Sequence, residues 1–346
     1  MLIWELKNGV FMQGRKIDKI TIKGFKSIRE LVDFELRDLN VIVGANGAGK
    51  SNFIQVFKML RAMASGALQD YVVRRGGANA LFFNGVKQTP QIDLSVGGFT
   101  GSLVPTADDR VSVLINGNQP VSELSDFSAD WMVYHFQDAT ELSAPRRSEI
   151  VEHAQYLCED GGNVAPFLMR LQNGDLASRR SYKEIVDAVR LVMPFFDDFQ
   201  LNAMSYGPAE KVKLSWRQKG SDYPFQPYHF SDGSLRFICL ATALLQPRPP
   251  SLIVLDEPEL GLHPLAIDVV SEMVKAAASR SQLVVATQSP ALVDQFSFKD
   301  MIVAGRQNGA TVFERLNEAD FSCWMDDYTI GELWRDNVIQ GGPAHE

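Results

Sequence analysis

One eight-residue segment, Gly44-Ala45-Asn46-Gly47-Ala48-Gly49-Lys50-Ser51, constrains the fold of this chain more than any other feature. It satisfies the pattern G-x-x-x-x-G-K-[ST], in which a glycine-rich loop connects a strand to a helix. The apolar run Leu39–Val43 before it predicts a strand buried on both faces. Over residues 53–60, apolar side chains repeat at helical spacing. The sequence therefore predicts a strand, a tight loop and a helix in succession.

Such a loop has the chemistry to hold phosphate groups. Its glycines let successive backbone N–H groups point at phosphate oxygens, and the following helix adds the partial charge of its N-terminus. Lys50 would neutralise the terminal phosphates, and the Ser51 hydroxyl would hold Mg²⁺. The alternative is an ordinary glycine-rich turn. The predicted nucleotide-binding residues are Asn46, Gly47, Ala48, Gly49, Lys50, Ser51 and Asn52.

A second apolar run, Ser251–Leu255, ends in the carboxylates Asp256 and Glu257. A buried strand rarely ends in two acids unless they serve a cation or a reaction. Together with the phosphate loop, this pattern predicts that Asp256 binds Mg²⁺ through a water and that Glu257 polarises the attacking water as general base. The alternative is a pair of solvated carboxylates at a strand end.

The remaining patterns indicate an α/β protein. Residues 140–205 are more polar and their pattern predicts a small helical lobe, with helices expected at Glu149–Cys158 and Tyr182–Met193. A hairpin turn is expected at Asn116-Gly117. The final third alternates helix and strand, which is typical of a parallel sheet covered by helices. Strands are expected over 17–22, 39–43, 91–99, 110–115, 131–136, 251–255 and 282–286, and further helices over 235–245 and 264–278.

Composition excludes several classes. The sequence has no run of eighteen apolar residues, so it predicts no membrane span. Residues 1–15 lack the pattern of a secretory signal. The cysteines Cys158, Cys239 and Cys323 fit neither a disulfide framework nor zinc spacing, so we expect a cytoplasmic protein. The net charge of −8 argues against a protein coated in phosphate-binding cations, although it leaves room for a local basic groove.

A family resemblance rests on three further segments. Phe230-Ser231-Asp232-Gly233-Ser234-Leu235-Arg236 resembles the signature motif of ABC ATPases, L-S-G-G-Q, or L-S-x-G-E in the SMC branch. Gly24-Phe25-Lys26-Ser27-Ile28 is similar to the opening of SMC and RecF-like heads. Leu255–Pro264 matches the Walker B stretch of small bacterial "AAA family" predicted ATPases of that branch, and Ala286-Thr287-Gln288-Ser289-Pro290 stands at the switch position.

The resemblance implies a P-loop NTPase of the ABC-ATPase head type, with ATP and Mg²⁺ as cofactors. Its fold would be a mostly parallel core sheet with an antiparallel β subdomain and a small helical lobe. We expect one head over residues 16–346, preceded by an extension over 1–15. Within the head we expect an N-terminal lobe over 16–140, a helical insertion over 141–205, and a C-terminal lobe over 206–346.

The resemblance also implies a head-to-tail homodimer, or a higher oligomer, that sandwiches two ATP molecules. The phosphate loop of one subunit would face the signature residues of the other. Gln137 falls where such proteins carry the Q-loop, so it would reach Mg²⁺; the alternative is a polar residue after a strand. The residues expected to act in trans are Ser231, Asp232, Gly233 and Ser234, and the expected metal residues are Ser51, Gln137 and Asp256.

Two departures from the family pattern bear on catalysis. The switch residue is usually His, and here it is Gln288, which can hydrogen-bond a phosphate but cannot accept a proton as imidazole does. We expect Glu257 and Gln288 to be the catalytic residues, and hydrolysis either to be slow or to rely on Glu257 alone. The second departure, Asp232-Gly233-Ser234 in place of Gly-Gly-Gln, fits the SMC-like branch better than the transporter branch.

Spacing narrows the function further. Only 181 residues separate Lys50 from Ser231, without heptads, so long coiled-coil arms are excluded, and the 56 residues after Pro290 leave too little room for a fused nuclease. We expect an ATP-hydrolysing head that gates a separately encoded effector, in DNA surveillance or phage (antiviral) defence. The alternatives are a non-hydrolysing nucleotide-dependent scaffold and a DNA-binding clamp, and the residues leave DNA binding open.

Five residues outside these motifs have two interpretations each. His263 either caps the helix at Pro264 or senses the nucleotide of a partner subunit. The pairs Arg74-Arg75 and Arg146-Arg147 either reach phosphate or DNA or, as we favour, lie in solvated loops.

Overall fold

The computed structural model describes residues 16–115, 121–136, 143–206, 209–321, 323–324 and 327–339. Its central sheet has six strands in the order β17-β16-β3-β15-β14-β7, and only β16 and β17 pair antiparallel. β3 and β15 are buried along their whole length, which explains their nearly continuous apolar runs. The strands are β3 (Leu39–Val43), β7 (Met132–Tyr134), β14 (Leu252–Asp256), β15 (Gln282–Thr287), β16 (Met301–Gln307) and β17 (Ala310–Arg315).

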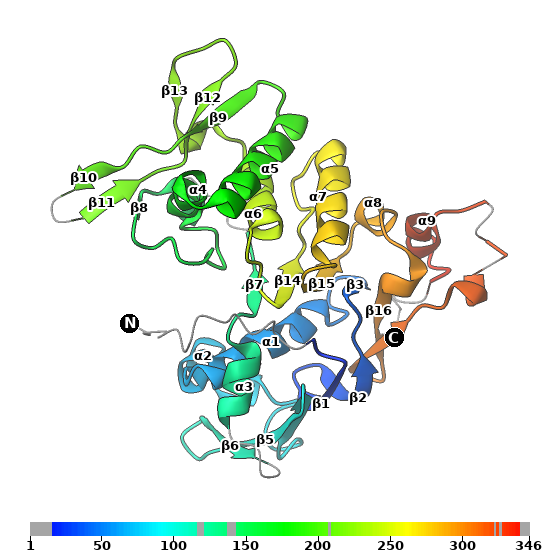
Figure 1. Cartoon of the computed structure of the whole chain (residues 1–346). Helices are drawn as coiled ribbons and strands as arrows, with labels where there is room; N and C mark the ends of the chain where they lie inside the picture. Colours follow the sequence, from blue (N-terminus) through cyan, green and yellow to red (C-terminus); the bar gives the residue numbers. More distant parts are fainter. Residues whose placement is uncertain are drawn as a thin grey trace.

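Helices cover both faces of this sheet, so each face has its own hydrophobic core (Figure 1). Along β14, Ile253 and Leu255 face one core, whereas Leu252 and Val254 face the other. The second core contains α1 (Lys50–Ala64). The first contains α4 (Val164–Asn173), α5 (Leu176–Val192), α6 (Asp232–Leu245) and α7 (Pro264–Ala277), and the short helices α8 (Pro290–Val293) and α9 (Ile330–Arg335) border it. The predicted alternation of the final third is confirmed.

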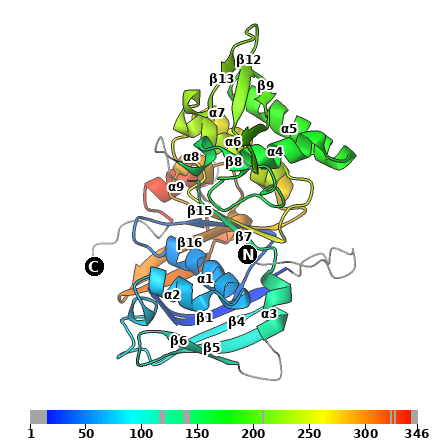
Figure 2. The same cartoon turned by 90° about the vertical axis from the view of Figure 1, so that its left-hand side faces the viewer.

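An antiparallel sheet in the order β2-β1-β4-β5-β6 lies beyond α1, so that this helix is sandwiched between the two sheets (Figure 2). The predicted antiparallel subdomain is therefore present. The turn expected at Asn116-Gly117 lies outside the described residues. The elements are β1 (Lys19–Phe25), β2 (Ile28–Glu35), β4 (Ile92–Val96), β5 (Phe99–Pro105) and β6 (Val111–Ile115), with α2 (Leu68–Arg74) and α3 (Val121–Ser128) beside them.

The segment between β7 and α6 combines helices with two small sheets, in the orders β10-β11-β8 and β13-β12-β9. The helix expected over Tyr182–Met193 is present as the larger part of α5. The helix expected at Glu149–Cys158 is wrong, because Glu149 and Ile150 pair with β11, a distant partner that local periodicity cannot reveal. The strands are β8 (Glu149–Ile150), β9 (Phe196–Gln200), β10 (Met204–Tyr206), β11 (Ala209–Val212), β12 (Ser215–Gln218) and β13 (Pro224–Phe225).

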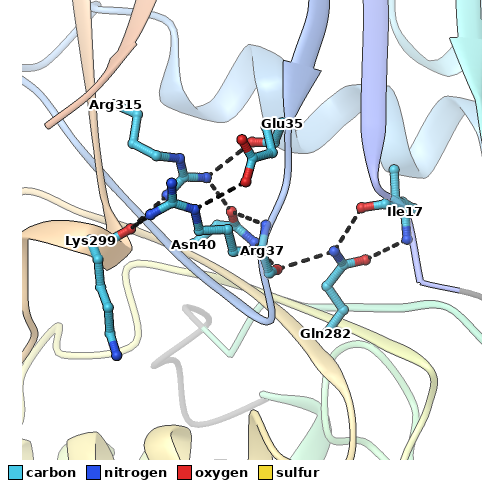
Figure 3. Close-up of polar contacts among 7 residues, drawn as sticks. All are labelled: Ile17, Glu35, Arg37, Asn40, Gln282, Lys299 and Arg315. Atoms are coloured by element: carbon cyan, nitrogen blue, oxygen red, sulfur yellow. Dashed lines mark hydrogen bonds and ion pairs between the residues drawn. The ribbon is translucent and has the colours of Figure 1, made fainter. Parts of the chain in front are cut away.

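Buried polar side chains close the N-terminal edge of the central sheet (Figure 3). The side-chain amide of Asn40 donates to the carbonyls of Arg37 and Leu283, and its oxygen accepts from Arg315 at 2.7 Å. Gln282 bonds both the N–H and the carbonyl of Ile17. We call this cluster the polar hub; it comprises Ile17, Glu35, Arg37, Asn40, Gln282, Lys299 and Arg315. It ties the starts of β3 and β15 to the ends of β2 and β17.

No helix within the described ranges is long and apolar enough to cross a membrane.

Candidate active site

The phosphate loop joins β3 to α1 in a conformation that requires glycine at two positions. Gly49 has φ +109°, and a Cβ there would lie 2.1 Å from the Thr311 hydroxyl oxygen. A Cβ on Gly44 would lie 2.4 Å from the carbonyl oxygen of Ala304. The loop is therefore pressed against β16 and β17, which hold its backbone in place. Within it, Ala48 is buried, whereas Asn46, Gly47 and Ser51 are exposed.

The side chain of Lys50 turns back over the loop. Its ammonium donates to the carbonyls of Gly44 at 2.6 Å and Ala45 at 3.1 Å, and the residue is only 6 % exposed. Burial lowers the pKa of Lys50, although the carboxylates of Glu257, Asp256 and Glu259 oppose that shift. An ammonium that carbonyl oxygens already satisfy within this loop has the position and the charge to take phosphate oxygens instead.

A chain of side-chain hydrogen bonds, which the sequence did not reveal, supports the loop from β17. Thr311 donates its hydroxyl to the carbonyl of Ala48 at 2.9 Å and contacts the Ser27 hydroxyl at 2.7 Å. Asn52 in turn donates to Ser27 at 2.6 Å. Ser27 belongs to the Gly24–Ile28 segment, which resembles the opening of SMC and RecF-like heads. This resemblance was the one sequence feature that could have pointed to the hydrogen-bonded support of the loop.

A hollow of about 370 Å³ lies beside this support. Asn52, which directly follows Ser51, forms part of its wall, so the hollow adjoins the phosphate loop. Its lining mixes cations, amides and aromatic rings: Lys26, Ser27, Asn52, Ala80, Phe82, Phe83, Asn84, Gly85, Arg306 and Gly309.

The two carboxylates predicted at the end of β14 lie at the same edge of the sheet as the phosphate loop, because β3, β15 and β14 are parallel neighbours. Burial, with a smaller contribution from Glu257, raises the pKa of Asp256. His135, which follows β7, places its Nδ1 3.8 Å from an Asp256 oxygen. Burial and nearby cations lower the pKa of His135, so this ring is neutral at neutral pH.

Glu257 and Gln288 are in direct contact. The side-chain amide of Gln288 donates to a Glu257 carboxylate oxygen at 3.0 Å. The backbone of Glu257 has φ +48°, and its N–H donates to the carbonyl of Ala286 at 2.8 Å. Strained backbone of this kind in a non-glycine residue is typical of functional sites. The two residues expected to be catalytic are therefore adjacent, although they are 31 residues apart in sequence.

The signature segment begins α6. Ser231 is the N-cap, and its hydroxyl accepts from the Ser234 N–H at 3.1 Å. Asp232 pairs with Arg146 at 2.6 Å. Gly233 packs so closely on the loop after β14 that a Cβ there would lie 2.3 Å from the Gly261 carbonyl oxygen. The hydrogen bonds of Ser231 and Asp232 thus run to Ser234 and Arg146 rather than to the phosphate loop of the same chain.

The sequence favoured a solvated loop for Arg146, and this prediction is wrong. Its side chain is 8 % exposed, and besides Asp232 it donates to the carbonyls of Pro227 and Phe230, so it holds the segment that leads into the signature. His263 is the N-cap of α7 and accepts from the Leu265 N–H at 3.3 Å. Gln137 lies outside the described residues.

Two family models match the sequence. One, described as "AAA domain, putative AbiEii toxin, Type IV TA system", matches residues 159–294, and one described as "AAA ATPase domain" matches residues 16–84. No curated protein matches the chain.

Solved structures of SMC heads share the fold. An Smc head bound to the C-winged helix domain of ScpA is 16 % identical, with a TM-score of 0.62 over 88 % of this chain and 99 % of that one. An Smc head with an extended coiled coil from Pyrococcus furiosus, bound to the C-terminal domain of ScpA, is 15 % identical, with a TM-score of 0.57 over 90 % of this chain and 98 % of that one. An Smc head from Pyrococcus yayanosii with a coiled coil and joint is 13 % identical, with a TM-score of 0.57 over 90 % of this chain and 99 % of that one.

Proposed function

We propose that this chain, an ABC-type ATPase head of the SMC and RecF-like branch, binds ATP with Mg²⁺ at the C-terminal edge of its central sheet and hydrolyses it slowly. The observation that carries the proposal is the convergence of three elements at that edge: the Lys50 ammonium, the pair Asp256 and Glu257, and the amide of Gln288. They lie at or just after the C-terminal ends of β3, β14 and β15, which are parallel neighbours. In open α/β sheets ligands bind at this edge.

Each residue has a role that follows from its chemistry. The loop N–H groups and Lys50 would hold the phosphates, while Ser51 and Asp256 would hold Mg²⁺, which neutralises phosphate charge when bound. Glu257 would orient and polarise the attacking water. Gln288, by donating to Glu257, would help to fix the orientation of that carboxylate. A nucleoside would occupy the neighbouring hollow, whose volume lies within the usual range for small-molecule sites, roughly 300–1,000 Å³.

The signature would serve a second copy of the chain. Ser231 and Asp232 are exposed at the start of a 14-residue helix whose N-terminus favours anions. Leu260 and Leu265, on either side of His263, are 46 % and 48 % exposed, which suits an interface better than solvent. We propose an ATP-dependent homodimer that acts on a separate effector protein. The family description that names a toxin system is consistent with such a two-protein arrangement.

A non-hydrolysing nucleotide-dependent scaffold is the second candidate. The observation in its favour is Gln288 itself, because its amide donates to the predicted general base and cannot accept a proton. Phosphate release distinguishes the two candidates, since a scaffold would bind ATP tightly and release none.

The test measures phosphate release and molar mass for the wild type, Glu257→Gln and, as a matched exposed control, Glu272→Gln on α7. We expect slow release by the wild type and the control, and none by Glu257→Gln. In size-exclusion chromatography with light scattering, Glu257→Gln should become a dimer when Mg²⁺ and ATP are added. A protein that binds ATP but releases no phosphate would be a scaffold, and a Glu257→Gln protein that stays monomeric with ATP bound would contradict the sandwich.

A further inference from the structure

Glu259, two residues beyond the predicted general base, is a third carboxyl group at the catalytic edge. It is only 9 % exposed, and its Oε1 accepts the Thr287 hydroxyl at 2.5 Å. Its Oε2 is buried and has no hydrogen-bond partner within the described part of the chain. Burial raises the pKa of Glu259. A buried carboxyl that is only half satisfied costs stability, so its presence calls for a functional reason.

Apart from its own backbone N–H, the groups that the Glu259 carboxyl bonds belong to the switch segment Ala286–Pro290 within the described residues. Thr287 is fully buried at the end of β15, and its oxygen also accepts the Ser289 N–H at 3.0 Å. The carboxyl group of Glu259 additionally interacts with the backbone N–H of Gln288. Glu259 thus bonds Thr287 directly and reaches the Ser289 N–H through the Thr287 hydroxyl, while the Gln288 side chain between them contacts Glu257 at 3.0 Å.

We propose that Glu259 is a positioning residue: through Thr287 it fixes the switch segment so that the Gln288 amide meets the Glu257 carboxylate. The inference rests on the proposed hydrolysis, in which Glu257 and Gln288 take part. In the proposed reaction Glu259 would act through Glu257 and Gln288 and not on the nucleotide itself, because it links the turn after β14 to the end of β15.

Three substitutions separate this role from mere packing. Thr287→Val keeps the volume but removes the hydroxyl, and Glu259→Ala removes the carboxyl. Glu259→Gln keeps an oxygen that accepts the Thr287 hydroxyl, and we expect it to retain activity. We expect Thr287→Val and Glu259→Ala to lower kcat for ATP roughly tenfold or more, with KM changed less than about threefold. Combining either with Gln288→Ala should add little, because the residues act as one unit.

Amide hydrogen exchange supplies a readout that does not depend on turnover. Glu259→Ala and Thr287→Val should speed exchange over residues 286–290 and leave the phosphate loop at 44–52 unchanged, whereas Glu259→Gln should match the wild type. Unchanged kcat and unchanged exchange in Thr287→Val would overturn the inference, as would a Glu259→Gln protein as impaired as Glu259→Ala. A wild type that releases no phosphate refutes the proposed hydrolysis instead, and the exchange data still decide the positioning role.

Discussion

The two edges of the central sheet differ in how completely their polar groups are satisfied. At the N-terminal edge, every polar atom of the Asn40 side chain lies in hydrogen bonds with the polar hub or with Leu283. At the C-terminal edge, and among the residues that the structure describes, Lys50 hydrogen-bonds only loop carbonyls and one Glu259 oxygen has no partner. Asp256, Glu257 and Glu259 there place three carboxyl groups within four positions.

The difference separates stability from function. A fully bonded buried network stabilises one arrangement of the chain, whereas an edge with crowded carboxylates and strained backbone costs stability. Such a cost is typical of a site arranged for a ligand that the chain itself does not supply. Substitutions at the N-terminal edge should therefore lower the free energy of unfolding with little effect on ATP affinity. Substitutions at the C-terminal edge should do the reverse.

The largest expected effect is that of Lys50→Ala on nucleotide binding. Removing the ammonium from the phosphate site should raise the Kd for ATP roughly 1,000-fold, about 4 kcal/mol. Unfolding should change little, because Lys50 bonds carbonyls that water can satisfy. Titration calorimetry with ATP measures the affinity, and Lys183→Ala, an exposed lysine on α5, is the control. Unaltered affinity would place the phosphates elsewhere.

Asn40→Ala should destabilise the N-terminal edge of the central sheet. It removes a buried side chain that makes four hydrogen bonds, so we expect a loss of about 3 kcal/mol in the free energy of unfolding. Urea denaturation measures the loss, and Asn173→Ala, which is exposed at the end of α4, should change it little. The ATP affinity of the folded fraction should stay within about twofold. A large loss of affinity would show that the edges are not separate.

Gly233→Ala tests whether the signature segment takes part in dimer formation. The added Cβ would meet the Gly261 carbonyl oxygen at 2.3 Å, so α6 or the loop after β14 must shift, at a cost of roughly 1–2 kcal/mol in stability. We expect ATP to bind as in the wild type but not to drive dimer formation when the substitution is combined with Glu257→Gln. Analytical ultracentrifugation follows the dimer, and one that forms normally would remove Gly233 from the interface.

The smallest effect concerns Glu259→Gln and pH. Burial raises the pKa of Glu259 in the folded state, so its ionised form is penalised once the pH exceeds the unfolded value. At pH 8 the variant should unfold about 2 °C above the wild type. The gain should shrink as the pH falls toward about 4 and vanish below it, where the glutamate becomes protonated in both states. Differential scanning calorimetry across this range measures it, and a gain at pH 4 but not at pH 8 would contradict the sign.

The sequence predicted the features that are local. The phosphate loop, the apolar strands beside it and the Asp-Glu pair are contiguous patterns, and the alternation of helix and strand in the final third predicted the parallel sheet. The helix expected at Glu149–Cys158 failed because a strand of two residues is decided by its partner, β11.

Contacts between distant segments were not predictable in the same way. Arg146 lies 86 residues from Asp232, and Asn40 lies 275 residues from Arg315, so no periodicity connects them. Glu259 did leave a signal, because it is a further acid after the Asp-Glu pair at the end of a buried strand. Its partner Thr287 became visible only once β14 and β15 were adjacent.

Hydrogen exchange of the wild type with and without Mg²⁺ and ATP tests the division between the two edges most directly. We predict that saturating ATP slows exchange over residues 44–52, 256–259 and 286–289 and leaves the polar hub around Asn40 and Gln282 unchanged. Two results would contradict the account. One is that ATP leaves the exchange of residues 44–52 unaltered, and the other is that ATP slows exchange mainly at the polar hub.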